Sequence, residues 1–364
     1  MRLLKSLAIF AAAFFSFFNF ASAHEAYVVP YGTFWSDMHA RSSTNFLEVL
    51  HNKADLKVAV YVILAVLAGL TINFFFRRSA WGRKSSDFIE RFSHLGPQFV
   101  RYTVATAFFL SAYFGTFLGP ELHGSLFAHP ELLRVALFLI SILIALGFLT
   151  ELAALAGIII FLISFGVFKS YMFTYTNYLG ELIVLLLFGM RVFSLDKYIF
   201  GPLRRFRSFE KYETVIVRVM YGLALAYTAI NVKIFHPDLT VLVVNAYHLN
   251  SFHWLFPSDP VLITLGAGIV ETVIGLFIIF GFEMRLTVLV SLFYLTLSII
   301  FFKESVWPHL LLYGISLDLL VQPEVFTLDH LFLKHHRAEK KWWKRPFSPH
   351  NVLGKSSRGA LDIQ

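Results

Sequence analysis

The sequence predicts an all-α polytopic membrane protein, and three observations support this class. Of the 364 residues, 57% are hydrophobic and only 15% are charged, whereas a soluble domain carries about 25% charged residues. The mean hydropathy is +0.67. Nine apolar runs lie beyond residue 55, and each is long enough, or nearly so, to cross a bilayer core of about 30 Å.

The chain begins with a segment that has the pattern of a signal peptide. Residues 1–23 combine Arg2 and Lys5, a long apolar run, and the small residues Ala21, Ser22 and Ala23, which fit a cleavage site. An uncleaved signal anchor is the alternative. Residues 24–55 are polar and aromatic and too few for a core of their own, so we expect an external segment.

A single span and two blocks of four spans follow. The first span occupies 56–78; the blocks, named repeat A and repeat B, occupy 98–194 and 213–321. The expected spans within the blocks are 98–118, 132–149, 152–168, 178–194, 213–235, 261–281, 285–302 and 306–321. A basic linker, 195–212, joins the repeats, and a basic tail, 322–364, ends the chain.

The basic residues predict the orientation. Lys and Arg concentrate in cytoplasmic loops, and nine spans place the stretch after the first span, the linker and the tail on one side. We therefore expect an external N-terminus and a cytoplasmic C-terminus in the plasma membrane, the inner membrane of a bacterium. The net charge of +8 then reflects topology and contact with the lipid bilayer rather than nucleic-acid binding.

The two blocks look like copies of one another. Arg218 and Pro237 stand 117 residues after Arg101 and Pro120. Gly281-Phe282 likewise stands 134 residues after Gly147-Phe148. Because four spans is an even number, both copies enter from the same side, which predicts parallel four-helix-bundle repeats.

The copies differ in their polar residues. Repeat B has Lys233 and Glu271 where repeat A has Thr116 and Leu137. Repeat A therefore looks like a structural partner, and repeat B like the copy that keeps a polar site.

Four ionisable residues of repeat B form the predicted polar site in its outer half. They are Lys233, Glu271, His309 and Glu304. Ionisable residues inside a bilayer are costly, so each is a functional candidate. Glu271 fits proton-coupled quinone or transport chemistry, or hydrogen bonding that joins helices. His309 could be a haem ligand, a hydrogen-bond donor to a quinone or a structural donor.

A second group lies near the cytoplasmic face, where Arg218, Arg285 and Asp318 are expected to form a structural charge layer. Arg pairs well with carboxylates because its guanidinium is a fixed fork. We expect these residues to pin helix ends.

The absence of cysteine excludes several kinds of chemistry for these residues. Without it the chain has no disulfide, iron–sulfur cluster, thiolate-bound metal or covalently attached haem. We expect no metal site and no covalently bound cofactor.

Residues 213–321 resemble the DoxX-like membrane family, with a degenerate second copy at 98–194. The resemblance is carried by Arg218, Lys233, Pro237, Glu271, Gly275, Gly281, Arg285, Glu304, Trp307 and His309. It implies a four-helix bundle with a polar site near its outer face.

Members of this family differ in function. Some are quinone-linked subunits of oxidoreductases, others assist the maturation of redox enzymes, and distant relatives carry secretory cargo. The resemblance implies a quinone-associated or redox-partner membrane subunit, with a separate redox or client protein as partner. The alternatives are a proton-coupled small-molecule transporter and an assembly or cargo partner without chemistry of its own; the sequence leaves open whether the chain is an enzyme.

Overall fold

The computed structural model describes most of the chain between residues 51 and 329. The described residues are 32, 35, 36, 38, 42–47, 51–189, 194–200, 212–246, 260–302, 306–322 and 326–329. The expected signal peptide, Glu304 and nearly all of the tail lie outside them.

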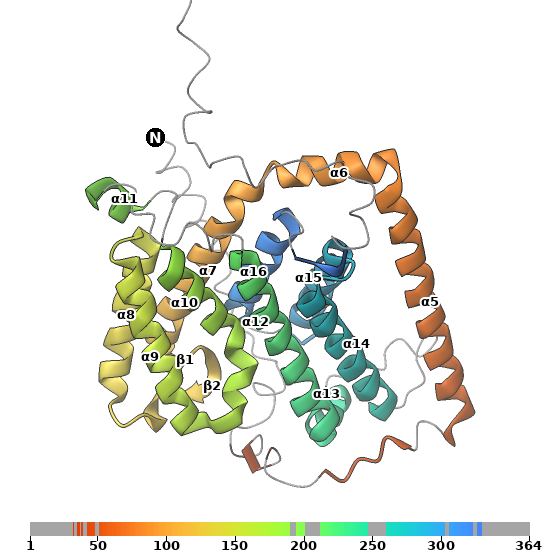
Figure 1. The fold of residues 1–364 in the computed structure, drawn as a ribbon. Helices are drawn as coiled ribbons and strands as arrows, with labels where there is room; N and C mark the ends of the chain where they lie inside the picture. The colour runs from red at the N-terminus through yellow and green to blue at the C-terminus, as the bar shows by residue number, and fades with distance from the viewer. Residues whose placement is uncertain are drawn as a thin grey trace, which may run out of the picture.

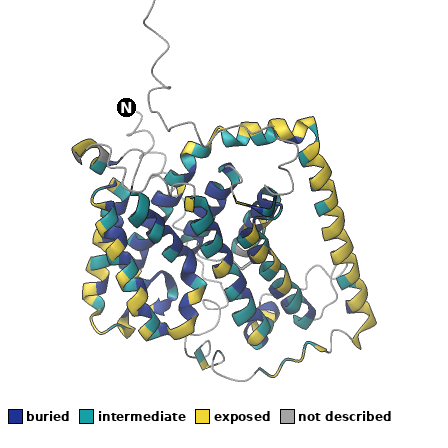
Figure 2. Cartoon of the chain, in the orientation of Figure 1, coloured by how far each residue is buried: buried dark blue, intermediate teal, exposed yellow. Residues whose placement is uncertain are grey.

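The first span is a long helix that stands apart from the rest of the molecule. Helix α5, Lys53–Arg78, begins at Asn52, whose side chain accepts a hydrogen bond from the Ala54 amide. Most of its residues are exposed along its whole length, and it runs beside the bundles rather than within them (Figures 1 and 2). Helix α6, Ala80–Glu90, turns away from it at Ser79 and leads back to the bundles (Figure 1).

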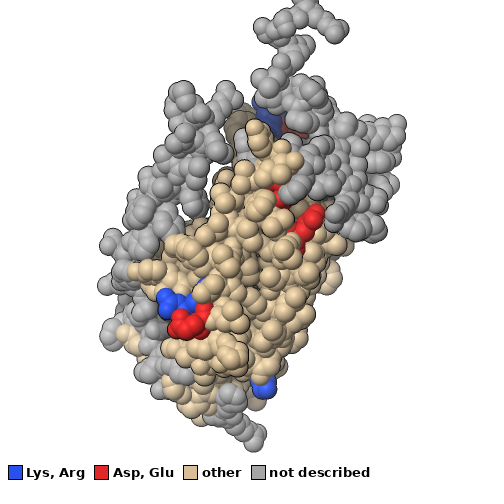
Figure 3. All heavy atoms as spheres, turned by 90° about the vertical axis from the view of Figure 1, so that its left-hand side faces the viewer, with Lys and Arg blue, Asp and Glu red and all other residues tan. Residues whose placement is uncertain are grey.

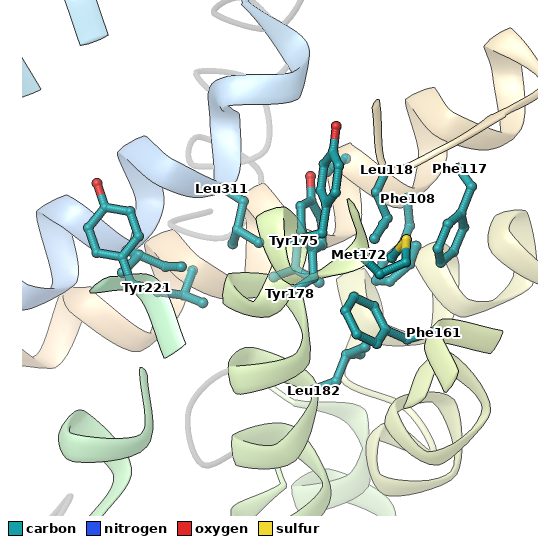
Figure 4. Packing of buried hydrophobic residues seen from close by; sticks show 14 of the residues in the cluster. Phe108, Phe117, Leu118, Phe161, Met172, Tyr175, Tyr178, Leu182, Tyr221 and Leu311 are labelled. Atoms are coloured by element: carbon teal, nitrogen blue, oxygen red, sulfur yellow. The ribbon is translucent and has the colours of Figure 1, made fainter. Parts of the chain in front are cut away.

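Repeat A folds around helices that correspond to its four expected spans. They are α7, Gly96–Phe114; α8, Pro130–Leu146; α9, Thr150–Phe168; and α10, Thr176–Phe188. The 3₁₀ helices η1, Ser93–Leu95, η2, Gly124–Leu126, and η3, Lys169–Tyr175, and helix α11, Leu195–Phe200, complete this part. Its core is aromatic and aliphatic and includes Phe108, Phe161, Met172 and Leu182 (Figure 4).

Repeat B has the same order of long helices. They are α12, Glu213–Thr228, continued by the π-helical η5, Ala229–Phe235; α14, Pro260–Phe280; α15, Met284–Phe302; and α16, Leu310–Val321. Helix α13, Pro237–Ala246, follows η5, and the 3₁₀ helix η7, Trp307–His309, precedes α16. Helix α16 packs on α7 and helix α12 packs on α10, so the two repeats share one interface.

Several helices are long and apolar enough to span a bilayer. Among the described residues there are four such helical segments: Lys53–Arg78, Thr150–Phe188, Glu213–Phe235 and Pro260–Phe280. The second joins α9, η3 and α10. The face formed by α8 and α9 exposes Leu132, Phe138, Leu152 and Ile159, and Figure 3 shows few charged side chains on that side. The chain is an all-α membrane protein.

The corner between the second and third helices of repeat A is closed by hydrogen bonds. Gly147 adopts φ 62° and ends α8, while the amide of Phe148 donates to the carbonyl oxygen of Leu143 over 2.9 Å. This is a glycine C-cap of the Schellman type. Asp196 then accepts the Thr150 amide over 3.1 Å, so its carboxylate caps the start of α9.

The same arrangement closes the corresponding corner of repeat B. Gly281 adopts φ 65°, and the Phe282 amide donates to the carbonyl oxygen of Phe277 over 2.9 Å. Asp329 accepts the Met284 amide over 3.0 Å at the start of α15. Each aspartate also donates its own amide to the corner glycine's carbonyl oxygen. The residues expected to begin the linker and the tail therefore fasten the bundles.

The two repeats differ at the opposite end. The expected span 98–118 is helical only to Phe114, because Gly115 adopts φ 71° and ends α7. Pro120 lies in a β-hairpin of β1, Thr116–Phe117, and β2, Gly119–His123, whereas Pro237 begins α13. The two prolines therefore differ in local structure, since Val232 stands where repeat A has Gly115 and the helix continues.

Close packing of α12 on α14 depends on small residues. A Cβ atom at Gly275 would lie 2.7 Å from the carbonyl oxygen of Gly222 and 2.7 Å from the backbone nitrogen of Ala226. Small residues at such crossings let backbones approach closely in a membrane.

We predict that Gly275→Ala destabilises the protein by roughly 1–3 kcal/mol, because the added methyl group overpacks this crossing. The control is Gly266→Ala on the same helix, where nothing lies within 4 Å of an added Cβ; it should be neutral or stabilising by up to about 1 kcal/mol. Denaturant unfolding in detergent micelles measures both. Equal stability of the two variants would contradict the close crossing.

Candidate functional site

The site in repeat B is built on a π-helical segment. Residues Ala229–Phe235 of η5 have a wider turn than the α-helix that precedes them. Such segments occur often at functional sites. Lys233 lies on this segment and is 9% exposed.

Glu271 reaches Lys233 because of its spacing on α14. Gly268 and Gly275 face α12 and η5 closely. Glu271 stands three residues after the first and four before the second, so it lies on the same helix face. The Lys233 ammonium donates a hydrogen bond to Glu271 Oε1, and the two form an ion pair whose side chains are 11% and 14% exposed.

Tyr294 of α15 flanks this pair. The Lys233 Nζ atom lies 5.9 Å from the centre of the Tyr294 ring, within the range of a cation–π interaction. The site thus combines contributions from η5, α14 and α15 in one apolar bundle.

The arrangement is chemically costly to maintain. Removing two charges from water costs several kcal/mol per ion, and apolar residues of similar size are often as stable or more so. Repeat A has Thr116 and Leu137 at these positions. The residues at these positions in repeat A cannot form an ion pair, so a four-helix repeat does not itself require one.

The other two predicted site residues are placed differently. His309 is buried, at 6% exposure, in η7 before α16. The neighbouring Trp307 stacks on Phe114 at the end of α7, with ring centres 5.6 Å apart. The structure joins Lys233 to Glu271, and Glu304 lies outside the described residues. Their convergence on the pair stays a prediction.

The three residues of the predicted charge layer each fasten a different contact. Arg218 donates to the carbonyl oxygen of Phe326 over 2.8 Å, beside Gly281. Arg285 forms an ion pair with Glu90 of α6 at 2.9 Å. Asp318 accepts from Gln322 over 3.0 Å and lies against Gly96 at the start of α7. Their partners are ones that the sequence did not suggest, and a common charge layer stays a prediction.

A buried ionic cluster at the α14–α15 corner was not predicted. Arg77 of α5 pairs with Asp329 at 2.7 Å and with Glu283 at 3.2 Å, and Asn73 donates to Glu283. The sequence does contain a sign of this cluster. Asp329 stands 133 residues after Asp196, so the similarity of the two repeats continues beyond their predicted ends.

The external segment is attached to repeat B through Asp238, which lies in the first turn of α13. Ser43 and Thr44 donate their amides to its carboxylate over 2.7 and 3.0 Å. Burial alone would raise the pKa of Asp238, but hydrogen bonds from Thr44, Ser43 and Ser42 outweigh it and hold the pKa below its usual value. Trp35 contacts Phe168 and Tyr171 of repeat A, so this segment touches both repeats.

Comparisons with known proteins add no relative to this description. No family model, no curated protein and no solved structure matches the chain.

We predict that breaking the Lys233–Glu271 pair is costly whereas replacing both partners is not. Lys233→Thr or Glu271→Leu alone should destabilise the protein by about 3 kcal/mol, because one buried charge is left uncompensated. The double variant, which carries the residues of repeat A, should lie within about 1 kcal/mol of the wild type. Unfolding in detergent micelles measures the cycle, and additive losses would show that the pair is not coupled.

Proposed function

We propose that this chain is a DoxX-like membrane protein whose repeat B binds the head group of a membrane quinone, as the membrane subunit or partner of a separate redox protein. The observation that carries the proposal is the buried Lys233–Glu271 pair beside Tyr294. In an apolar bundle the ammonium can donate to the carbonyl oxygens of a quinone, and the carboxylate can accept from the hydroxyls of the reduced quinol.

The donor set fits this group. Lys233 has three N–H donors, one of which is used by Glu271 Oε1. In this proposal the same ammonium would also donate to a carbonyl oxygen of the quinone. Glu271 Oε2 is the atom at which a proton would be held or passed on, and Tyr294 would flank the ring.

A quinone, when bound, supplies two-electron, two-proton redox chemistry. Because the chain has no cysteine, we assign the electrons to a separate redox protein that docks on it. The role of Lys233 and Glu271 is then to orient the head group and manage its protons.

We also propose nine spans and a duplicated bundle, with the N-terminus outside and the tail in the cytoplasm of a bacterium. Two features support this. A helix or helical run lies at each of the nine expected ranges, and the corners at Gly147 and Gly281 share the same hydrogen bonds.

Reporter fusions test the orientation. We expect a phosphatase fused after residue 55 to be active and phosphatases fused after residues 208 and 364 to be inactive, because the last two sites follow an odd number of expected spans. Fluorescent-protein fusions at the same sites should give the complementary pattern. Phosphatase activity at 208 or 364 would refute the span number.

Quinone binding is tested directly with the full chain in phosphatidylcholine nanodiscs and a short-chain ubiquinone. We expect saturable binding by fluorescence quenching, and at least about tenfold weaker binding for the Lys233→Thr/Glu271→Leu variant, which loses a buried charge-assisted hydrogen bond. Gly266→Ala is the control and should bind like the wild type.

The same variants separate this function from transport. A proton-coupled transporter is favoured by the parallel bundles and by a carboxylate in mid-span. Equal quinone binding by the double variant, together with proton flux into liposomes that depends on Glu271, would replace the quinone proposal with transport.

A further inference from the structure

Buried polar atoms without a partner gather at the hairpin end of repeat A. Two hydrogen bonds join the β1–β2 hairpin there to η3, which leads directly into α10. Five polar side chains of the hairpin, η3 and the first turn of α10 each have a buried oxygen that makes no hydrogen bond to the described protein. These atoms are Thr116 Oγ1, Glu121 Oε2, Thr174 Oγ1, Asn177 Oδ1 and the Tyr178 hydroxyl. Since buried polar groups are normally paired, unpaired atoms on these neighbouring segments point to a ligand.

Glu121 is the charged member of this group. It lies on β2 and is 3% exposed. Its Oε1 atom accepts the hydroxyls of Tyr171, over 3.1 Å, and Tyr175, whereas Oε2 has no partner. No described basic side chain forms an ion pair with it. A buried carboxylate in such surroundings is stabilised by a positive charge.

Three tyrosines lie together beside this carboxylate, and two of them donate their hydroxyls to it. The ring centres of Tyr171 and Tyr175 are 6.4 Å apart, and those of Tyr175 and Tyr178 are 6.1 Å apart. Figure 4 shows the last two side by side, with their hydroxyls pointing the same way. The ring centres of Trp35 and Tyr171 are 5.2 Å apart. Tyr171 and Tyr175 bring their hydroxyls, not their ring faces, to the carboxylate, and a hydroxyl oxygen can also accept from an ammonium N–H.

Repeat B shows what repeat A lacks. Asp238 stands 117 residues after Glu121, and both of its oxygens accept hydrogen bonds, from Ser43 and Thr44. Lys233 stands 117 residues after Thr116. Where repeat B carries an ammonium of its own, repeat A therefore carries a threonine with an unpartnered hydroxyl.

We propose that the hairpin end of repeat A binds a primary ammonium group, held by Glu121 and surrounded by Tyr171, Tyr175 and Tyr178. A primary ammonium offers three N–H donors to several acceptors that lack one. A calcium ion, which takes 6–8 oxygen ligands, fits a site with one carboxylate and several rings less well. The site is separate from the Lys233–Glu271 pair and does not depend on quinone binding.

The ammonium group has two sources, a soluble amine and the head group of an ethanolamine lipid. The test uses the full chain in phosphatidylcholine nanodiscs and measures the midpoint of thermal unfolding, because a ligand of the folded state raises it. Ethylammonium chloride should raise the midpoint saturably, and sodium chloride at equal ionic strength should not. If the lipid is the natural ligand, nanodiscs with phosphatidylethanolamine should raise the midpoint and remove the response to ethylammonium; if a soluble amine is, this lipid should have no effect.

Variants locate the site. Glu121→Gln keeps the shape of the side chain but loses the charge, and should weaken the ethylammonium response at least about tenfold. Asp238→Asn is the matched control in repeat B, where the acceptors are filled, and should respond like the wild type. Tyr178→Phe keeps the ring, removes one oxygen and should weaken the response several-fold.

Three results would overturn the proposal. The first is an equal response of the wild type and Glu121→Gln, which includes the case of no saturable response in any nanodisc and would leave Glu121 a structural residue. The second is an equally strong response to tetramethylammonium, which has no N–H donor. The third applies if Glu121→Gln does not fold. It is a response of Tyr178→Phe to ethylammonium that equals the response of the wild type.

Discussion

The hydrogen bonds that close the two glycine corners hold the rest of this structure in place. A helix end inside or near a bilayer leaves amides and carbonyls that water does not reach, so the protein must satisfy them itself. Asp196 and Asp329 do so for the third helix of each repeat. Asp329 also accepts Arg77, so a single carboxylate fastens α5, the α14–α15 corner and the segment after α16.

The long helices could be predicted because each follows from a single property, an apolar run of sufficient length. The ionic partners could not be predicted in the same way. Glu271 and Lys233 were expected near one another, yet their contact depends on the π-helical winding of η5. Arg77 reads in the sequence as a topology signal, and only the fold shows that Glu283 and Asp329 surround it.

The largest failure of prediction lies at the hairpin end of repeat A. The run 98–118 stays largely apolar to its end, and hydropathy does not show that Gly115 takes a left-handed conformation. That single residue replaces a helical turn by a hairpin and brings Glu121 inward. The two repeats thus share their corners and diverge at the other end, which is where both of the proposed sites lie.

The π-helical segment has a mechanical consequence for the ion pair. A π turn holds one residue more than an α turn, and each residue of an α-helix advances about 100° around the axis. Rewinding Ala229–Phe235 as α-helix would rotate the later residues of the segment by about that angle. Lys233 would then turn away from Glu271 without any movement of α14. A change between π-helix and α-helix in this one segment would therefore also break or form the Lys233–Glu271 ion pair.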